Sequence, residues 1–172
     1  GDLVEKDSIC LDVGCDHALL DIYLVHRKAN IKTIASDIAQ GPLEQAKKNI
    51  EREHLEDVIE TRLGSGLETY TDEINTIIIS GMGGRNVIGI FKDNIKKLNK
   101  VETLIISPNN YQEDVKRFLC KHGFYIQNEE FVKDKKFIYQ IIIFKKGKKR
   151  YSKIAGRTFA RRKRPLTDRF CS

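Results

Sequence analysis

The sequence predicts an α/β domain whose central sheet is mostly parallel. Short apolar runs alternate with segments in which apolar residues recur at helical spacing, as in right-handed βαβ units with helices on both faces of a sheet. Five of these runs end in turns rich in glycine, asparagine or aspartate. The last two runs are separated by residues 133–136 alone, which leaves no room for a helix and predicts a closing antiparallel hairpin.

The first half of the chain is predicted as three strands and two helices. The strands cover 9–13, 31–36 and 58–63, and the helices cover 18–26 and 43–53, with a short helix or turn over 67–70. Leu19, Leu20 and Leu24 recur at helical spacing. Pro42 opens the second helix, where its missing N–H group would have no helical partner.

The second half begins with the clearest strand, residues 74–80 (INTIIIS), whose continuous apolar run fits burial on both faces. A helix over 86–99, a strand over 102–107 and a helix over 112–122 follow, and Gly123 is placed to end the last helix. The hairpin strands are predicted over 124–132 and 137–144.

Length and charge divide the chain into a body and a tail. The 172 residues fit one domain. The net charge is +7, but residues 145–172 contain 12 Lys/Arg and one acid, whereas the rest of the chain has a net charge of −4. We therefore expect a domain over 1–144 and a basic, disordered tail over 145–172.

Several classes of protein are disfavoured. No apolar run approaches the roughly 18–20 residues of a membrane span, and no secretory signal is visible, so a cytoplasmic location is expected. The four cysteines show no CxxC spacing, and the four histidines form no metal-binding set.

The first candidate site is the turn after the first strand, within ICLDVGCDHALL. A dinucleotide-binding loop would have the pattern GxGxxG, but only Gly14 is present, followed by Cys15, Asp16 and His17. A carboxylate at Asp16 would repel a pyrophosphate, which disfavours NAD or FAD. S-adenosylmethionine has no phosphate and carries a cationic ammonium and sulfonium, so Asp12 or Asp16 suits it. Alternatively, Asp16 only caps the following helix.

The next two strand ends offer weaker signals. Asp37 ends the second strand and is placed to bind ribose hydroxyls, and the less favoured alternative is a helix cap or a loop acid. The sequence Gly64-Ser65-Gly66 allows a flat ligand to approach the backbone, with Ser65 at an adenine edge. A plain turn is the alternative.

Two further loops complete the edge of the sheet. Residues 81–84 (GMGG) precede a helix start that can bind an anion or let a base approach closely, and Arg85 can contact phosphate or remain solvated. Asn109 can hydrogen-bond a base, and Tyr111 can stack on one. The alternative for residues 108–111 is a loop that caps the next helix.

Several strings together resemble the bacterial tRNA adenine-N1 methyltransferase family that modifies position 22, the TrmK family. They are DVGCDHALL, ASDIAQGPLEQAKKNI, LGSGL, IIISGMGG, ISPNNYQEDVKRFL and IYQIIIF. The resemblance covers residues 3–144 and implies a Rossmann-like class I methyltransferase fold with a seven-stranded sheet. It also implies S-adenosylmethionine as cofactor and tRNA as partner. The family's C-terminal helical domain has no counterpart in the tail, and Ser65 and Ser107 replace an acidic residue and Gln.

The resemblance and the loops together give a set of expected site residues. Asp16 and Asn109 are the expected catalytic residues. The cofactor contacts are expected at Asp12, Gly14, Cys15, Asp16, His17, Asp37, Ile38, Ser65, Gly66, Leu67, Gly81, Met82 and Gly83, and the substrate contacts at Gly84, Arg85, Pro108, Asn109 and Tyr111.

The chemistry that the resemblance implies needs no strong base. The N1 atom of neutral adenine carries a lone pair, so alignment with the methyl donor is the main contribution of the enzyme. We expect a monomer that binds neither a metal nor a membrane. The alternatives are a methyltransferase with another acceptor, a catalytically silent cofactor- or RNA-binding module that uses the basic tail, and an NAD-dependent oxidoreductase.

Overall fold

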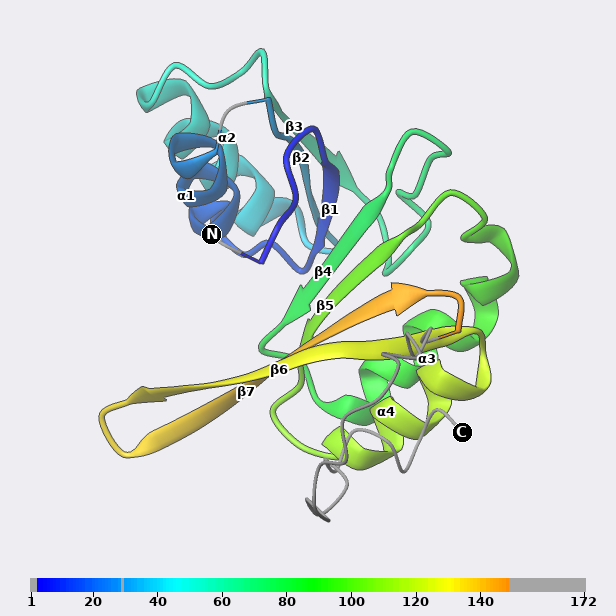
Figure 1. Ribbon diagram of the computed structural model, residues 1–172. Coiled ribbons are helices and arrows are strands. Elements are labelled where there is room, and N and C mark those ends of the chain that lie inside the picture. Colours follow the sequence, from blue (N-terminus) through cyan, green and yellow to red (C-terminus); the bar gives the residue numbers. More distant parts are fainter. Residues whose placement is uncertain (1–2, 29, 149–172) are drawn as a thin grey trace, which may run out of the picture.

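The computed structural model describes residues 3–28 and 30–148 and contains one seven-stranded sheet (Figure 1). The strand order is β3-β2-β1-β4-β5-β7-β6, with β7 antiparallel to both of its neighbours and all other pairs parallel. The strands are β1 (Ile9–Val13), β2 (Lys32–Asp37), β3 (Ile59–Leu63), β4 (Thr76–Ser80), β5 (Thr103–Ser107), β6 (Phe124–Asp134) and β7 (Phe137–Lys146). The helices are α1 (Leu19–Arg27), α2 (Gln40–Arg52), α3 (Gly84–Asn94), which continues into a 3₁₀ turn (Ile95–Lys97), and α4 (Gln112–Lys121). The predicted fold class is confirmed.

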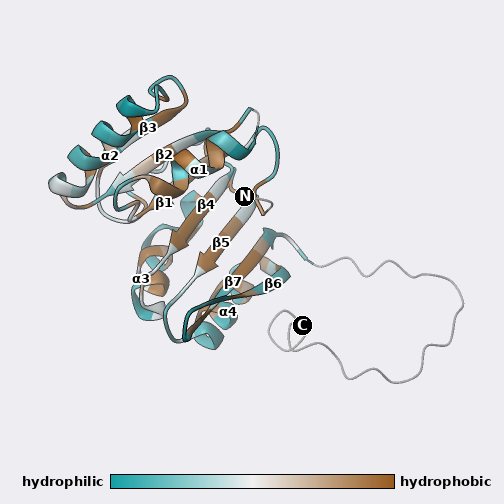
Figure 2. Ribbon diagram, turned by 90° about the vertical axis from the view of Figure 1, so that its left-hand side faces the viewer, coloured by the Kyte–Doolittle hydropathy of each residue, from teal (hydrophilic) through white to brown (hydrophobic). Residues whose placement is uncertain are grey.

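The two faces of the sheet are covered by different helices, because successive side chains of each strand point to opposite faces. One face packs against α3 and α4, with Ile77 and Leu104 in contact with a cluster that includes Phe91 and Leu119. The other face packs against α1 and α2 near β1, β2 and β3. Figure 2 shows the apolar character of β4, β5 and β7.

Strand β7 extends two residues past the expected domain boundary at 144. Lys145 lies opposite Thr103 of β5, and Lys146 lies opposite Phe124 of β6. The side chain of Lys145 donates to Thr103 Oγ1 and pairs with Glu5 at 2.6 Å. A basic sequence therefore does not end the strand, because the hydrogen bonds between strands are made by backbone groups. Residues 149–172, the greater part of the predicted disordered tail, lie outside the described residues. No helix in the described ranges is both long and apolar enough to cross a membrane.

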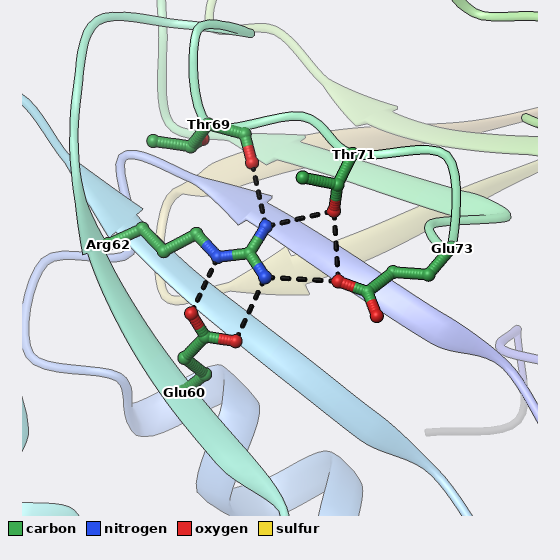
Figure 3. Close-up of polar contacts among 5 residues, drawn as sticks. All are labelled: Glu60, Arg62, Thr69, Thr71 and Glu73. Atoms are coloured by element: carbon green, nitrogen blue, oxygen red, sulfur yellow. Dashed lines mark hydrogen bonds and ion pairs between the residues drawn. The ribbon is translucent and has the colours of Figure 1, made fainter.

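The connection between β3 and β4 contains turns in place of a helix, and Arg62 organises it (Figure 3). Its guanidinium donates to both oxygens of Glu60, at 2.7 and 2.9 Å. It also donates to the Thr69 carbonyl, to the Thr71 hydroxyl and to Glu73, each at 3.0 Å. These contacts raise the pKa of Arg62 further, with Glu60 as the largest favourable cause. The half-buried side chain of Arg62 thus joins β3 to the connection that follows it, which begins with the predicted ligand-binding residues Ser65 and Gly66.

Replacing Arg62 with alanine is expected to lower the free energy of unfolding by about 1–2 kcal/mol, because several charge-assisted hydrogen bonds are removed at a partly solvated site. For a domain of this size the midpoint of thermal unfolding should fall by about 3–6 °C. The control is Arg52→Ala, whose exposed side chain lies 3.8 Å from Glu53. Equal effects of the two substitutions would contradict the assigned role of Arg62.

Candidate active site

The ends of the five parallel strands meet at one edge of the sheet because the strands are in register. Val13 pairs with Ser36, Asp37 with Leu63, and Ser80 with Ser107. The loops that follow these residues are therefore neighbours. Open α/β sheets bind ligands at this carboxyl edge, so the fold brings together the loops that the sequence singled out.

Gly14 holds the turn after β1 in contact with the loop after β4. Its N–H group donates to the Ser36 carbonyl at 2.8 Å, and its φ of +75° is in the left-handed region. A Cβ atom on Gly14 would lie 2.4 Å from Cε of Met82. The positive φ favours glycine here, and the close approach packs the flexible end of the Met82 side chain against the first turn.

A cavity of about 440 Å³ lies beside this turn, between the residues that follow β1 and those that follow β4. Its two carboxylates differ in exposure, since Asp12 is buried and the Asp16 side chain is 76% exposed. Nε2 of His17 lies 3.5 Å from the Asp16 carboxylate, and its buried Nδ1 has no hydrogen-bond partner among the described residues. The described lining residues are Asp12, Gly14, Cys15, Asp16, His17, Leu19, Leu20, Ser80, Gly81 and Met82, with no lysine or arginine among them. The cavity therefore suits a ligand with a positive charge and an apolar chain.

A third acid, Asp21, is a direct neighbour of Asp12 and was not predicted from the sequence. It is in the first turn of α1 and is fully buried. Burial raises its pKa to about 7, and burial together with the neighbouring Asp21 charge holds the pKa of Asp12 well above its usual range. The spacing of residues in the sequence could have indicated this burial. Asp21 precedes the buried Leu24 by three residues and therefore lies on the same face of the helix.

The Asp21 carboxyl makes the stability of the protein depend on pH. Its pKa in the folded state is above the unfolded value, so the native state binds more protons and stability falls as pH rises. This decrease should total about 2–3 kcal/mol between pH 5 and pH 8. The other groups whose charges act on this part of the site include Asp12, Asp37 and Lys28.

Urea unfolding of Asp21→Asn at pH 5, 6, 7 and 8 tests this dependence. The stability of the variant relative to wild type should increase steadily with pH, whereas Asp57→Asn, an exposed acid before β3, should follow the wild-type profile. Parallel profiles for wild type and Asp21→Asn would show that Asp21 does not titrate in this range.

Asp37 and the loop after β3 form the neighbouring part of the edge. One oxygen of Asp37 accepts the Ala39 N–H at 2.9 Å just before α2, and the Asp37 carbonyl accepts the Gly64 N–H at 3.0 Å. The adjacent Ile38 is 72% exposed. Asp37 thus orders the start of α2 with one carboxylate oxygen, and an uncovered apolar side chain lies beside it.

The loop at 64–67 has one residue turned inward and one outward. Ser65 is exposed, and its N–H donates to Glu68 at 2.9 Å. Gly66 has a φ of +57°, and a Cβ there would lie 3.2 Å from Ile90. Leu67 belongs to the main hydrophobic core, so its side chain supports the loop from below and does not face the site.

Asn109 and Asn110 bind the loop after β5 to the loop after β4. Asn109 donates its side-chain amide to the Gly81 carbonyl at 2.7 Å and its backbone N–H to the Met82 carbonyl at 2.8 Å. The Asn110 side-chain oxygen accepts the Gly84 N–H at 3.0 Å. The first N–H group of α3 is therefore already paired, which disfavours the anion site suggested for this loop. A Cβ on Gly84 would lie 2.4 Å from the Asn110 carbonyl oxygen.

Arg85 and Tyr111 contact each other at the outer part of this loop pair. The Arg85 guanidinium lies 4.5 Å from the centre of the Tyr111 ring, which is 43% exposed. Pro108, at the start of the loop after β5, is buried. The pair presents a flat cationic surface, while Pro108 can only shape the loop. In residues 3–28 and 30–148, no group of three or more His, Cys, Asp and Glu is arranged to hold a metal ion.

Comparisons with known proteins agree with this geometry. A family model described as a methyltransferase domain matches residues 1–142. A tRNA (adenine(22)-N(1))-methyltransferase of Bacillus subtilis is 30% identical over 145 residues, which cover 84% of this chain and 61% of that protein. This chain therefore spans less than two thirds of the length of that curated relative.

Two solved structures are similar in fold and sequence. Streptococcus pneumoniae Sp1610, a candidate tRNA (m1A22) methyltransferase in complex with S-adenosyl-L-methionine, superposes with a TM-score of 0.81 at 37% identity. The match covers 88% of this chain and 72% of that one. M. capricolum TrmK in complex with S-adenosyl-homocysteine gives a TM-score of 0.76 at 31% identity, covering 84% of this chain and 65% of that one.

Proposed function

Because this chain belongs to the TrmK family of class I methyltransferases, we propose that it transfers a methyl group from S-adenosylmethionine to N1 of an adenosine in tRNA, at position 22. The observation that carries this proposal is the cavity at the end of β1, which combines two carboxylates with apolar residues and has no lysine or arginine among its described lining residues. Such a lining fits a cationic amino acid and would repel a nucleotide phosphate.

The proposed cofactor contacts follow the strand ends. Asp12 and Asp16 hold the ammonium group, and Leu19 and Leu20 line the path of the aliphatic chain. Asp37 binds the ribose through the carboxylate oxygen not used by Ala39, and the exposed Ile38 packs on the adenine. Ser65 and Gly66 lie at the adenine edge. The bound cofactor supplies an electrophilic methyl group on a sulfonium.

The residues of the chain contribute alignment and charge stabilisation to the reaction. Asn109 is oriented by its bond to the Gly81 carbonyl, so its amide oxygen is left as an acceptor for the adenine N6 amino group. Methylation at N1 makes the base cationic, and the carboxylate of Asp16 and this amide oxygen stabilise that charge. Since N1 lies on the Watson–Crick edge, the adenosine must leave any base pair before it enters the site.

The proposed partner is tRNA, and the chain is proposed to act as a cytoplasmic monomer. Arg85 and Tyr111 supply a cation and an aromatic ring beside the loops that hold Asn109. These are the groups that bind phosphates and unstacked bases in RNA.

Calorimetry and methyl transfer together test the proposal. Titration with S-adenosylmethionine should give saturable binding, whereas NAD should give none. Incubation with labelled S-adenosylmethionine and tRNA transcripts should then label the RNA. Binding of NAD alone would contradict the cofactor assignment, and binding of S-adenosylmethionine with no labelled tRNA would favour a silent module.

A further inference from the structure

Strands β6 and β7 continue beyond the sheet as a two-stranded arm (Figure 1). β7 pairs with β5 only from Ile142 to Lys145, whereas it pairs with β6 as far as Phe137 opposite Asp134. Residues 129–141 thus form a hairpin, here called the β6–β7 arm, whose outer part is supported by no third strand. A two-residue turn closes it, with Lys135 at a φ of +51°.

The base of the β6–β7 arm is fixed to the body. The buried side chain of Lys116 in α4 forms an ion pair with Glu129 of β6. The same carboxylate accepts a hydrogen bond from the Gln140 side chain of β7 at 2.7 Å. These contacts join α4, β6 and β7 where the arm leaves the body, so the direction of the arm is set by the fold.

One face of the arm is apolar and continuous with a second cavity, of about 440 Å³. Val132, Phe137 and Tyr139 are 46%, 55% and 43% exposed and lie on the same face, because Val132 pairs with Tyr139 and Phe137 is two residues from it. Val132 and Tyr139 line the cavity, which is also lined by Ser80 and Gly81.

Ser80 and Gly81 also line the candidate cofactor cavity. The apolar face of the arm therefore leads to the end of β4, where the acceptor base must meet the methyl donor. The opposite face of the arm bears Phe131 and Ile138, which are 67% and 68% exposed and line neither of these two cavities.

The tip of the arm is basic on an otherwise acidic body. Residues 131–139 contain Lys133, Lys135 and Lys136 against a single acid, Asp134. The Lys136 ammonium lies 5.4 Å from the centre of the Phe137 ring. Cations beside exposed aromatic rings are the combination by which proteins bind unpaired nucleotides, since the cations contact phosphates and the rings stack on bases.

We propose that the β6–β7 arm is an RNA-docking element. Phe137 and Tyr139 stack on unpaired nucleotides adjacent to the acceptor adenosine, and Lys135 and Lys136 in the turn contact their phosphates. The inference rests on the proposed function for its choice of RNA. A nucleic acid fits better than a second copy of the chain, because the body is acidic and the face opens towards a site that must receive an extruded base.

The double variant Phe137→Ala/Tyr139→Ala tests the aromatic contacts, with Phe131→Ala/Ile138→Ala as its matched control on the opposite face. Fluorescence anisotropy with tRNA should show at least tenfold weaker binding for the first variant, as expected when base stacking is removed. The control should remain within about twofold of wild type. Circular dichroism and S-adenosylmethionine affinity should be unchanged in both, which separates docking from folding and cofactor binding.

The double variant Lys135→Gln/Lys136→Gln tests the phosphate contacts, with Lys133→Gln, opposite Ile138 on the other face, as its control. The slope of log Kd for tRNA against log salt concentration should decrease by about 0.7 for each phosphate that a lysine no longer neutralises. An unchanged slope would overturn the proposal. Equal weakening of tRNA binding by Phe137→Ala/Tyr139→Ala and by Phe131→Ala/Ile138→Ala would also overturn it. Alternatively, the wild-type chain self-associates, and Phe137→Ala/Tyr139→Ala abolishes this association without changing the affinity for tRNA. That result would show that a second copy of the chain covers the face, and it would overturn the proposal.

These binding measurements remain distinct from a test of the reaction. A wild-type chain that binds tRNA through the arm but transfers no methyl group would refute the proposed function and leave the docking role intact. A chain that methylates tRNA with the arm variants as active and as tightly bound as wild type would refute only the docking role.

Discussion

Replacing Asp12 with asparagine is expected to weaken S-adenosylmethionine binding by about 30- to 100-fold, the effect of removing a charge-assisted hydrogen bond from a buried site. Asp12 is 3% exposed yet lines the cavity, so its carboxylate can meet a ligand with little competition from water. Its raised pKa in the free protein adds a second signature. Binding of a cationic ligand favours ionisation of Asp12 and should release a proton.

Calorimetry in buffers of different ionisation enthalpy measures both the affinity and the proton release. The Asp57→Asn variant makes the same chemical change at an exposed site before β3 and should bind like wild type. S-adenosyl-homocysteine, which keeps the ammonium and lacks the sulfonium, should lose affinity for Asp12→Asn by a similar factor. If Asp12→Asn bound S-adenosylmethionine with wild-type affinity, Asp12 would not be a cofactor contact.

Replacing Asn109 with alanine is expected to reduce kcat for methyl transfer by about 100-fold, because the substitution removes an acceptor that aligns the base and stabilises the developing charge. S-adenosylmethionine affinity should stay within about threefold of wild type, because Asn109 does not line the cofactor cavity. Single-turnover kinetics with saturating tRNA separates this effect from weaker docking.

The matched control for Asn109 is Asn94→Ala. Asn94 donates its side-chain amide to the Ile90 carbonyl at 3.1 Å, the same kind of bond, but at the far end of α3. Its removal should leave kcat close to wild type. A loss of S-adenosylmethionine binding in Asn109→Ala, with kcat preserved, would assign Asn109 to the cofactor and not to the base.

The sequence predicted the strands well because their patterns are local. The β1 strand was predicted with its observed bounds, Ile9–Val13, since a short apolar run ends at a glycine turn. The meeting of the loops at the carboxyl edge of the sheet could be predicted because the strands are parallel. Helix α3 begins two residues earlier than the apolar pattern suggested, at Gly84, because the Asn110 side chain caps its N–H from another loop.

Features that depend on distant contacts were not accessible from the sequence. The close contact of the turn at Gly14 is with the side chain of Met82, which is far along the chain. The burial of Asp21 depends on how α1 packs, and the Arg62 contacts join β3 to residues as far along the chain as Glu73. The hairpin was predicted, but its extension beyond the sheet follows from the short pairing between β5 and β7.

The most direct test of the central claim is to map the methyl group on the RNA. Wild-type chain, S-adenosylmethionine and a tRNA transcript with adenosine at position 22 should yield N1-methyladenosine at that position, detected by nuclease digestion and mass spectrometry. A transcript with guanosine at position 22 should remain unmodified. Methylation of both transcripts at another nucleotide, or of neither while S-adenosylmethionine binds, would contradict the proposed reaction.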